Sequence, residues 1–170
     1  MPELRIRPVA DADLEALAGL NNGAVPAVNA LTVPDLARFA ATAPHFRVAV
    51  VVEDGPVGLM IALGPGADYD SLNYRWFADR YDAFLYVDRI VVDPAARSGG
   101  IGAALYRDLE AVARAAGVPR LACEVNLRPP NERSLRFHER LGFRGVGTQD
   151  TENGAKSVQL MIRDLTAPAR

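Results

Sequence analysis

The chain has 170 residues and a formal net charge of −2, with 49% hydrophobic and 24% charged residues. This composition is typical of a globular chain, and it excludes the basic field that nucleic-acid binding requires. One cysteine and two histidines are too few for a Cys/His zinc site, and a single thiol excludes an internal disulfide. No apolar run is long enough to span a membrane. We therefore expect one cytoplasmic domain over residues 1–170, with no metal, nucleic-acid or membrane partner.

The first third of the chain predicts strands and short helices. In chain order we expect a strand, two helices and two further strands, over residues 3–8, 11–20, 34–43, 46–53 and 56–63. Asp11 or Asp13 can cap the first helix, and Pro34 suits the first turn of the second. Asp54-Gly55, placed between two apolar runs, is a strong signal for a β-hairpin.

Residues 64–83 form a connection with an unusual composition. It holds the one tryptophan, Trp76, and also Tyr69 and Asn73, interleaved with acidic residues. Aromatic walls beside carboxylates and amides suit a cationic amine, through cation–π and charge-assisted contacts. The same composition is equally expected of a packed surface loop or a dimer contact. The sequence leaves these interpretations open.

A glycine cluster, Arg97-Ser98-Gly99-Gly100-Ile101-Gly102, stands between a predicted strand over 84–92 and a predicted helix over 101–116. Glycines at the start of a helix let an anion approach bare N–H groups, and the helix dipole favours negative charge there. The cluster therefore predicts a phosphate or diphosphate site. It lacks the lysine of a Walker loop, and Leu105 stands where a dinucleotide fingerprint needs glycine or alanine.

A second signature covers residues 121–143. A predicted strand over 120–125 leads to Pro129-Pro130, which block a helix upstream of Asn131. Asn131 is a good N-cap, and Gly142 suits the position just after the helix. Helical spacing places His138 on the inward face of this helix. A last strand is expected over 158–163.

Together the two motifs resemble those of the GNAT superfamily of N-acyltransferases: Arg-x-x-Gly-x-Gly over 97–102, and Asn-x-x-Ser-x-x-x-His-x-x-x-Gly-Phe over 131–143. The resemblance implies an α/β fold with a mixed, mostly antiparallel central sheet and helices on both faces. It also implies a splayed parallel strand pair, 84–92 and 120–125, joined by the helix in a right-handed crossover.

The resemblance further implies direct transfer of an acetyl group from acetyl-CoA to a primary amine of a small molecule or peptide, in a ternary complex. The implied acetyl-CoA contacts are Ile90, Val91, Val92, Arg97, Ser98, Gly99, Gly100, Ile101, Gly102, Ala103, Asn131 and Ser134. Backbone N–H groups near Val91 and Val92 would polarise the thioester. It stays open whether Arg97 contacts the diphosphate or braces the loop.

An alkylammonium has a pKa near ~10, so the reaction needs a base. Glu124 is the first choice, because it matches the base of ribosomal-protein alanine acetyltransferases, which this region resembles; Asp88 is the second. Alternatively, either residue is an ordinary carboxylate at a strand end, paired with an arginine and without a catalytic role. His138 stands where the family usually has tyrosine, so it either protonates the leaving thiolate or packs in the core. The connection containing Asn22 would border the amine site.

Two other functions compete with the enzyme. A catalytically silent acyl-CoA-binding domain would keep the glycine loop and lose turnover. A nicotinamide or flavin oxidoreductase is disfavoured by Leu105 and by the long gap between the strand end and the glycines. The acceptor and the acyl length stay open, and a homodimer is also left open.

Overall fold

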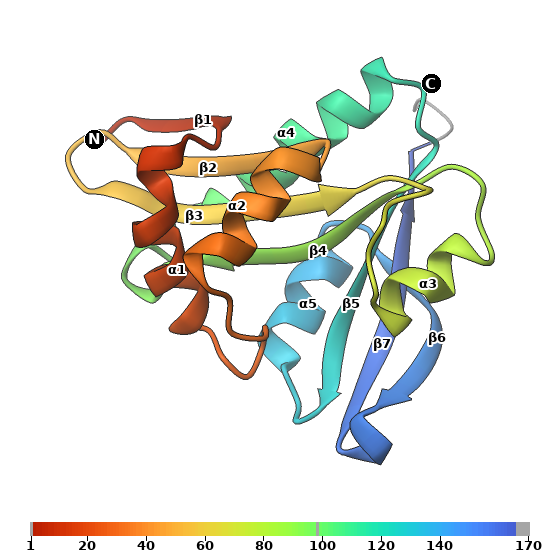
Figure 1. Ribbon diagram of the computed structural model, residues 1–170. Helices are drawn as coiled ribbons and strands as arrows, with labels where there is room; N and C mark the ends of the chain where they lie inside the picture. Colours follow the sequence, from red (N-terminus) through yellow and green to blue (C-terminus); the bar gives the residue numbers. More distant parts are fainter. Residues whose placement is uncertain (1, 98, 166–170) are drawn as a thin grey trace. The chain divides into compact units, whose positions relative to one another are not determined.

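A computed structural model describes residues 2–97 and 99–165. Its elements in chain order are β1 (Leu4–Pro8), η1 (Asp11–Asp13), α1 (Leu14–Asn22), α2 (Val33–Thr42), β2 (His45–Val51), β3 (Gly55–Leu63), α3 (Leu72–Ala78), β4 (Leu85–Val92), η2 (Pro94–Ala96), α4 (Ile101–Ala115), β5 (Arg120–Arg128), α5 (Glu132–Arg140), β6 (Arg144–Thr151), η3 (Glu152–Gly154) and β7 (Lys156–Asp164). Figure 1 labels the helices and strands.

The strands form a seven-stranded sheet in the order β1-β2-β3-β4-β5-β7-β6. β4 and β5 pair in parallel, whereas β1–β2, β2–β3, β5–β7 and β7–β6 pair antiparallel. The parallel register covers Leu85 opposite Leu121 and Tyr86 opposite Ala122, although β4 and β5 both continue beyond it. The predicted mixed sheet is confirmed, and the short parallel ladder is what the expected splay requires.

The chain divides into two compact units. The first holds the described residues up to Ala62 together with Arg89–Leu109, and the second holds Leu63–Asp88 and the described residues from Glu110 onward. The division falls inside β4 and inside α4, so each of these elements contributes residues to both units.

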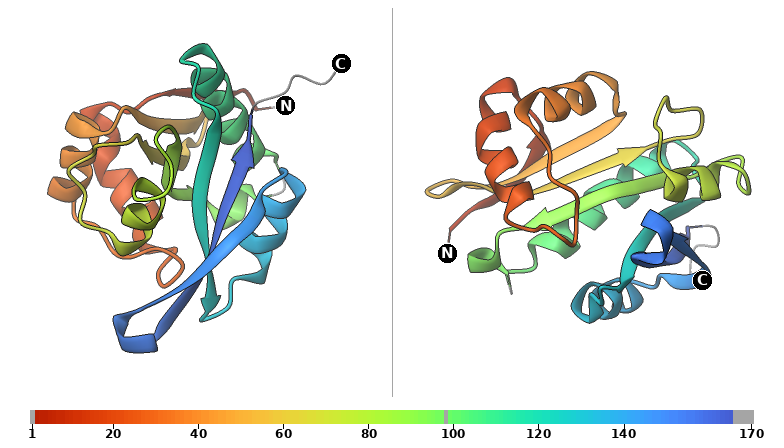
Figure 2. Two further views of the ribbon diagram at one scale, coloured as in Figure 1. Left: turned by 90° about the vertical axis from the view of Figure 1, so that its right-hand side faces the viewer. Right: turned by 60° about the horizontal axis from the view of Figure 1, so that its bottom comes forward.

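In the first unit, α1 and α2 cover one face of β1, β2 and β3, and the start of α4 lies on the other (Figures 1 and 2). Leu17, Leu36, Val48 and Ile61 are fully buried members of the core under α1 and α2. Asp13, one of the two aspartates expected to cap the first helix, stands at the N-cap position of α1, but its side chain makes no capping hydrogen bond there. Asp13 instead accepts hydrogen bonds from the Ala10 N–H and from the Arg7 guanidinium, at 2.8 and 2.7 Å.

In the second unit, α3 and α5 lie on opposite sides of β5 and β7, as the two views in Figure 2 show. The sequence did not predict α3 or β6. Ser71 caps α3 by accepting a hydrogen bond from the Tyr74 N–H at 3.2 Å. Strand β6 contains Gly145 and Gly147, which are poor strand formers, and its register with β7 shifts there. Among the described residues, no helix combines the length and the apolar character that crossing a bilayer requires.

Candidate active site

The glycine loop lies in the first unit, where it leads into α4. Gly100 has a φ of +72°, which L side chains rarely adopt, and a Cβ built on it would meet nothing within 4 Å. The Ala104 N–H donates to the Gly100 carbonyl at 3.0 Å, in the pattern of an α-helix. Because α4 begins at Ile101, the N–H groups of its first three residues have no carbonyl one turn earlier inside the helix. Ser98, also expected to contact the diphosphate, lies outside the described residues.

A cavity of about 400 Å³ lies in the same unit, against the end of β4 and the small side chains of α1. It is lined by Ala16, Gly19, Leu20, Gly23, Ala24, Pro56, Val91, Val92, Asp93, Pro94 and Arg97. The lining combines glycines and apolar side chains with one basic residue, Arg97, and one acidic residue, Asp93. Arg97, which the sequence left either on the diphosphate or on the loop, belongs to the lining of this cavity.

The expected base, Glu124, lies in the second unit on β5, with its carboxylate surrounded by polar groups from other elements. Glu124 Oε1 accepts a hydrogen bond from the Tyr86 hydroxyl at 2.8 Å and a longer one from Asn73 Nδ2 at 3.5 Å. Asn73 Oδ1 in turn accepts from Gln149 Nε2 at 2.8 Å. Four elements, β4, α3, β5 and β6, therefore hold one carboxylate. Burial, and next the negative charge of Glu124, raise the pKa of the Tyr86 phenol well above its ordinary value.

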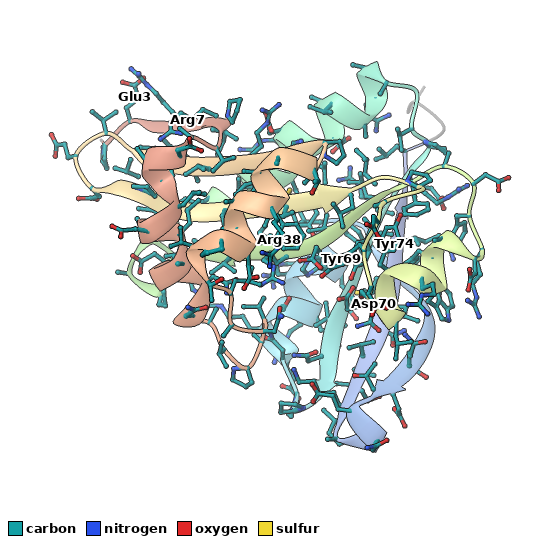
Figure 3. The ribbon with its side chains drawn as sticks, viewed as in Figure 1. Glu3, Arg7, Arg38, Tyr69, Asp70 and Tyr74 are labelled. Atoms are coloured by element: carbon teal, nitrogen blue, oxygen red, sulfur yellow. The ribbon has the colours of Figure 1, made fainter. Side chains whose placement is uncertain are left out.

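The second candidate base, Asp88, is also bonded to a tyrosine. The Tyr69 hydroxyl donates to Asp88 Oδ1. Tyr69, just before α3, and Tyr74, on α3, lie side by side (Figure 3), with their ring centroids 5.9 Å apart in an edge-to-face arrangement. Tyr74 also contacts Tyr86, at 5.5 Å between centroids. The structure thus brings Tyr69 and Asn73 to the two candidate carboxylates.

Trp76, the third expected acceptor contact, packs on β6. A Cβ built on Gly147 would lie 2.8 Å from the Trp76 indole, and the Arg80 guanidinium lies 4.0 Å above the Trp76 ring. The side chain is half-buried. These contacts make Trp76 a packing residue of α3, so its prediction as a substrate contact gains nothing from the structure.

Asn22, expected at the amine site, holds a loop of the first unit. Its Oδ1 accepts from the Leu31 N–H at 2.9 Å, and its Nδ2 donates to the Leu31 carbonyl at 3.1 Å. Nearby, the buried guanidinium of Arg89 donates to Asn21 Oδ1 at 2.9 Å and to Asn29 Oδ1 at 2.6 Å. These amide contacts order the connection that follows α1.

His138 points inward, as predicted, and is 3% exposed. Its Nδ1 lies 2.7 Å from the Ser134 carbonyl and 3.3 Å from the Ser134 hydroxyl, while Asn131 caps α5 by accepting from the Ser134 N–H at 3.3 Å. A carbonyl only accepts, so the Nδ1 of His138 carries the hydrogen in that bond, and Nε2 of the neutral ring has none to donate. Burial lowers the pKa of the His138 imidazole, opposed by the Ser134 carbonyl. This chemistry disfavours His138 as a general acid.

Tyr86 and Gln149 are polar partners that sequence reasoning missed. In the sequence, Tyr86 stands among the apolar residues of a predicted strand, where nothing marks its hydroxyl as functional. Gln149 lies in a strand that was not predicted. Only the fold brings them to Glu124, from 38 and 25 positions away in the chain. Within the described residues there is no group of three or more His, Cys, Asp or Glu side chains that could hold a metal ion.

The family model described as the acetyltransferase (GNAT) family matches residues 23–143. The chain belongs to this family. Glucosamine 6-phosphate N-acetyltransferase of Trypanosoma brucei brucei is 39% identical over 59 residues, which are 35% of this chain and 37% of that protein. The match therefore spans little more than a third of that relative.

Two solved structures show the same fold. Ard1 from Thermoplasma volcanium has a TM-score of 0.78 at 17% identity, over 96% of this chain and 99% of that chain. NAA60 of Arabidopsis thaliana, solved with a bisubstrate analogue, has a TM-score of 0.77 at 19% identity, over 98% of this chain and 100% of that chain. The family and the fold class expected from the two motifs are confirmed.

Proposed function

We propose that this GNAT protein is an N-acetyltransferase that moves the acetyl group of acetyl-CoA directly to a primary amine, with Glu124 as the base. The observation that carries the proposal is the Glu124 carboxylate, held among Tyr86, Asn73 and Gln149. A silent acyl-CoA-binding domain has no need of such an arrangement. The lone, buried Cys123 accords with a reducing compartment, and we place the activity in the cytoplasm.

In the proposed reaction, the alkylammonium first loses a proton to Glu124, directly or through water, because only the neutral amine is nucleophilic. The amine nitrogen then forms a bond to the thioester carbonyl carbon, the carbon–sulfur bond breaks, and coenzyme A leaves as its thiolate. The nitrogen gives up its second proton, which reaches the thiolate directly or through water, so the products are the amide and the free thiol. Nothing here needs a covalent enzyme intermediate. We assign His138 to packing and to holding α5, because its Nδ1–H is bonded within its own helix.

The cofactor loop has its own role. We propose that the first N–H groups of α4, from Ile101 to Ala103, bind the diphosphate with the help of Gly99 and Gly100. Support comes from the left-handed backbone of Gly100 and from the open space around it. Arg97 lines the adjacent cavity and can meet an anionic group of the same ligand.

The test is release of free thiol from acetyl-CoA in the presence of single amines. The panel combines hexosamine phosphates, short peptides with free N-termini and small alkylamines, because one relative is named for glucosamine 6-phosphate and one structure of this fold, the NatC complex, holds a peptide. We expect thiol release with one class and stoichiometric acetylation of its amine by mass spectrometry. Tight coenzyme A binding with no turnover on any amine would instead identify a silent binding domain.

A further inference from the structure

Tyr86 lies deep in the second unit, and its hydroxyl contacts the proposed base. It is 0% exposed, and its ring packs against Tyr74 and Phe77 at centroid distances of 5.5 and 5.7 Å. Its hydroxyl donates to Glu124 Oε1 at 2.8 Å. The ring cannot move without disturbing two aromatic neighbours, so the position of its hydroxyl is fixed by packing.

The same carboxylate oxygen faces a second, weaker donor. Asn73 Nδ2 lies 3.5 Å from Oε1, at the limit of a hydrogen bond, and Gln149 holds the Asn73 amide in that orientation. The Tyr86 hydroxyl is therefore the stronger of these two donors to Oε1. A donor of this kind stabilises the ionised carboxylate relative to the protonated acid.

We infer that Tyr86 is a positioning residue for the acetyl-transfer reaction: its hydroxyl orients the Glu124 carboxylate and keeps it ionised in the pH range where an amine must lose its proton. The inference rests on the proposed function, with Glu124 as the base. Tyr86 does not itself take the substrate proton. It acts through Glu124 alone.

The experiment compares the pH dependence of kcat/KM for the amine in the wild type, Tyr86→Phe and Tyr74→Phe. Tyr86→Phe keeps the ring and removes the donor, so Glu124 takes up a proton more readily and the acidic limb moves to higher pH by about one unit. Below that limb, kcat/KM falls by about tenfold relative to the wild type at the same pH.

Tyr74→Phe is the matched control, because it removes a hydroxyl from the same aromatic cluster. The Tyr74 hydroxyl accepts from the Ala67 N–H at 3.0 Å and donates to the Gly64 carbonyl at 2.6 Å, so its loss affects a loop. We expect this variant to lose stability and to keep the wild-type acidic limb.

The outcomes separate the inference from the proposed function. A wild type without turnover on any amine overturns the proposed function. An active wild type whose acidic limb is unmoved in Tyr86→Phe overturns the inference alone, as does an equal shift in Tyr74→Phe. Thermal unfolding of both variants checks that they fold, and an apparent KM for acetyl-CoA that stays within about twofold shows that the donor site is intact.

Discussion

Two carboxylates of the second unit, Glu124 and Asp88, each accept a hydrogen bond from a tyrosine hydroxyl. Hydrogen bonding to a tyrosine therefore does not distinguish the base from a structural carboxylate. Glu124 also accepts a longer hydrogen bond from the Asn73 amide, which Gln149 holds in place. A carboxylate bonded by several fixed groups is pre-oriented, which is what proton abstraction requires.

Substitution of Glu124 tests this assignment. Glu124→Gln keeps the shape of the side chain and an oxygen that can accept from Tyr86, but it removes the base. We expect the amine kcat/KM to fall by about 100-fold or more, with unchanged binding of acetyl-CoA by calorimetry. Asp88→Asn is the parallel variant, and we expect a smaller effect. A reversed order would transfer the role of base to Asp88.

His45 presents a different case, a titratable group of the first unit with no part in the proposed chemistry. It is 2% exposed, and its Nε2 lies 3.6 Å from Asp108 Oδ2, which also accepts from Arg47 Nε at 3.1 Å. Neither ring nitrogen has a hydrogen-bond partner among the described residues. Burial first, and then the charge of Arg47, lower the pKa of His45 from 6.5 to about 4, against the opposing effect of Asp108.

This lowered pKa predicts a loss of stability in acid. Below pH 6.5 the unfolded chain binds a proton at His45, whereas the folded chain binds it only below about pH 4. The free energy of unfolding should thus fall between pH 6.5 and 4, by up to about 3 kcal/mol. Urea titrations across this range measure it. In His45→Leu the decrease should be smaller by that amount, and an identical pH dependence in both proteins would contradict the assignment.

At the scale of elements, α3 and β6 together hold the donors around Glu124. Asn73 and Trp76, one helical turn apart on α3, contact Gln149 and Gly147 of β6. The close contact between Trp76 and β6 requires glycine at position 147, because the indole occupies the space that a side chain would fill. The contact between α3 and β6 therefore fixes the Asn73 amide that reaches Glu124, the proposed base.

Gly147→Ala tests this contact. The new Cβ would lie 2.8 Å from Trp76, so the ring or the helix has to move, and we expect a destabilisation of about 1–3 kcal/mol. Trp76 is the one tryptophan of the chain, so its fluorescence reports the movement directly. Gly145→Ala is the control on the same strand, because its Cβ would meet the flexible end of Gln159. Equal costs and equal emission spectra in the two variants would refute the packing argument.

These two elements, α3 and β6, are also the ones that the sequence did not predict. Strands such as β3 and helices such as α4 carry strong apolar patterns, so their positions were predicted closely. Gly145 and Gly147 weaken the strand pattern of β6, and α3 has only seven residues, Leu72–Ala78. The family resemblance suggested Glu124 and His138 as candidates, and their roles stay predictions. The partners of Glu124 depended on long-range packing, which periodicity in one sequence does not encode.

At the scale of the whole molecule, the glycine loop belongs to the first unit and Glu124 to the second. The glycine loop and the strand of Glu124 could be recognised from the sequence, because each is a short local run. The cavity beside the loop could not be predicted, since its lining combines α1, Pro56 of β3 and residues between Val91 and Arg97. If acetyl-CoA binds at the loop and in this cavity, as proposed, its binding should raise the stability of the folded chain.

A ligand that binds only the folded chain stabilises it by mass action. At a free acetyl-CoA concentration of about 100 times Kd, the gain is about 2.7 kcal/mol, which for a chain of this size raises Tm by about 5–10 °C. Gly100→Glu places bulk and negative charge where the diphosphate is proposed to bind. We expect this variant to show no rise in Tm at any acetyl-CoA concentration, measured by differential scanning fluorimetry.

The control has to separate charge from backbone strain, because the φ of +72° at Gly100 penalises any side chain. Asn tolerates this conformation better than most residues and adds no charge. Both variants should therefore have a lower Tm than the wild type without ligand, while Gly100→Asn alone should recover a concentration-dependent rise. If the Tm of Gly100→Glu rises with acetyl-CoA concentration as much as that of the wild type, the added bulk and charge do not affect binding. The diphosphate would then bind elsewhere.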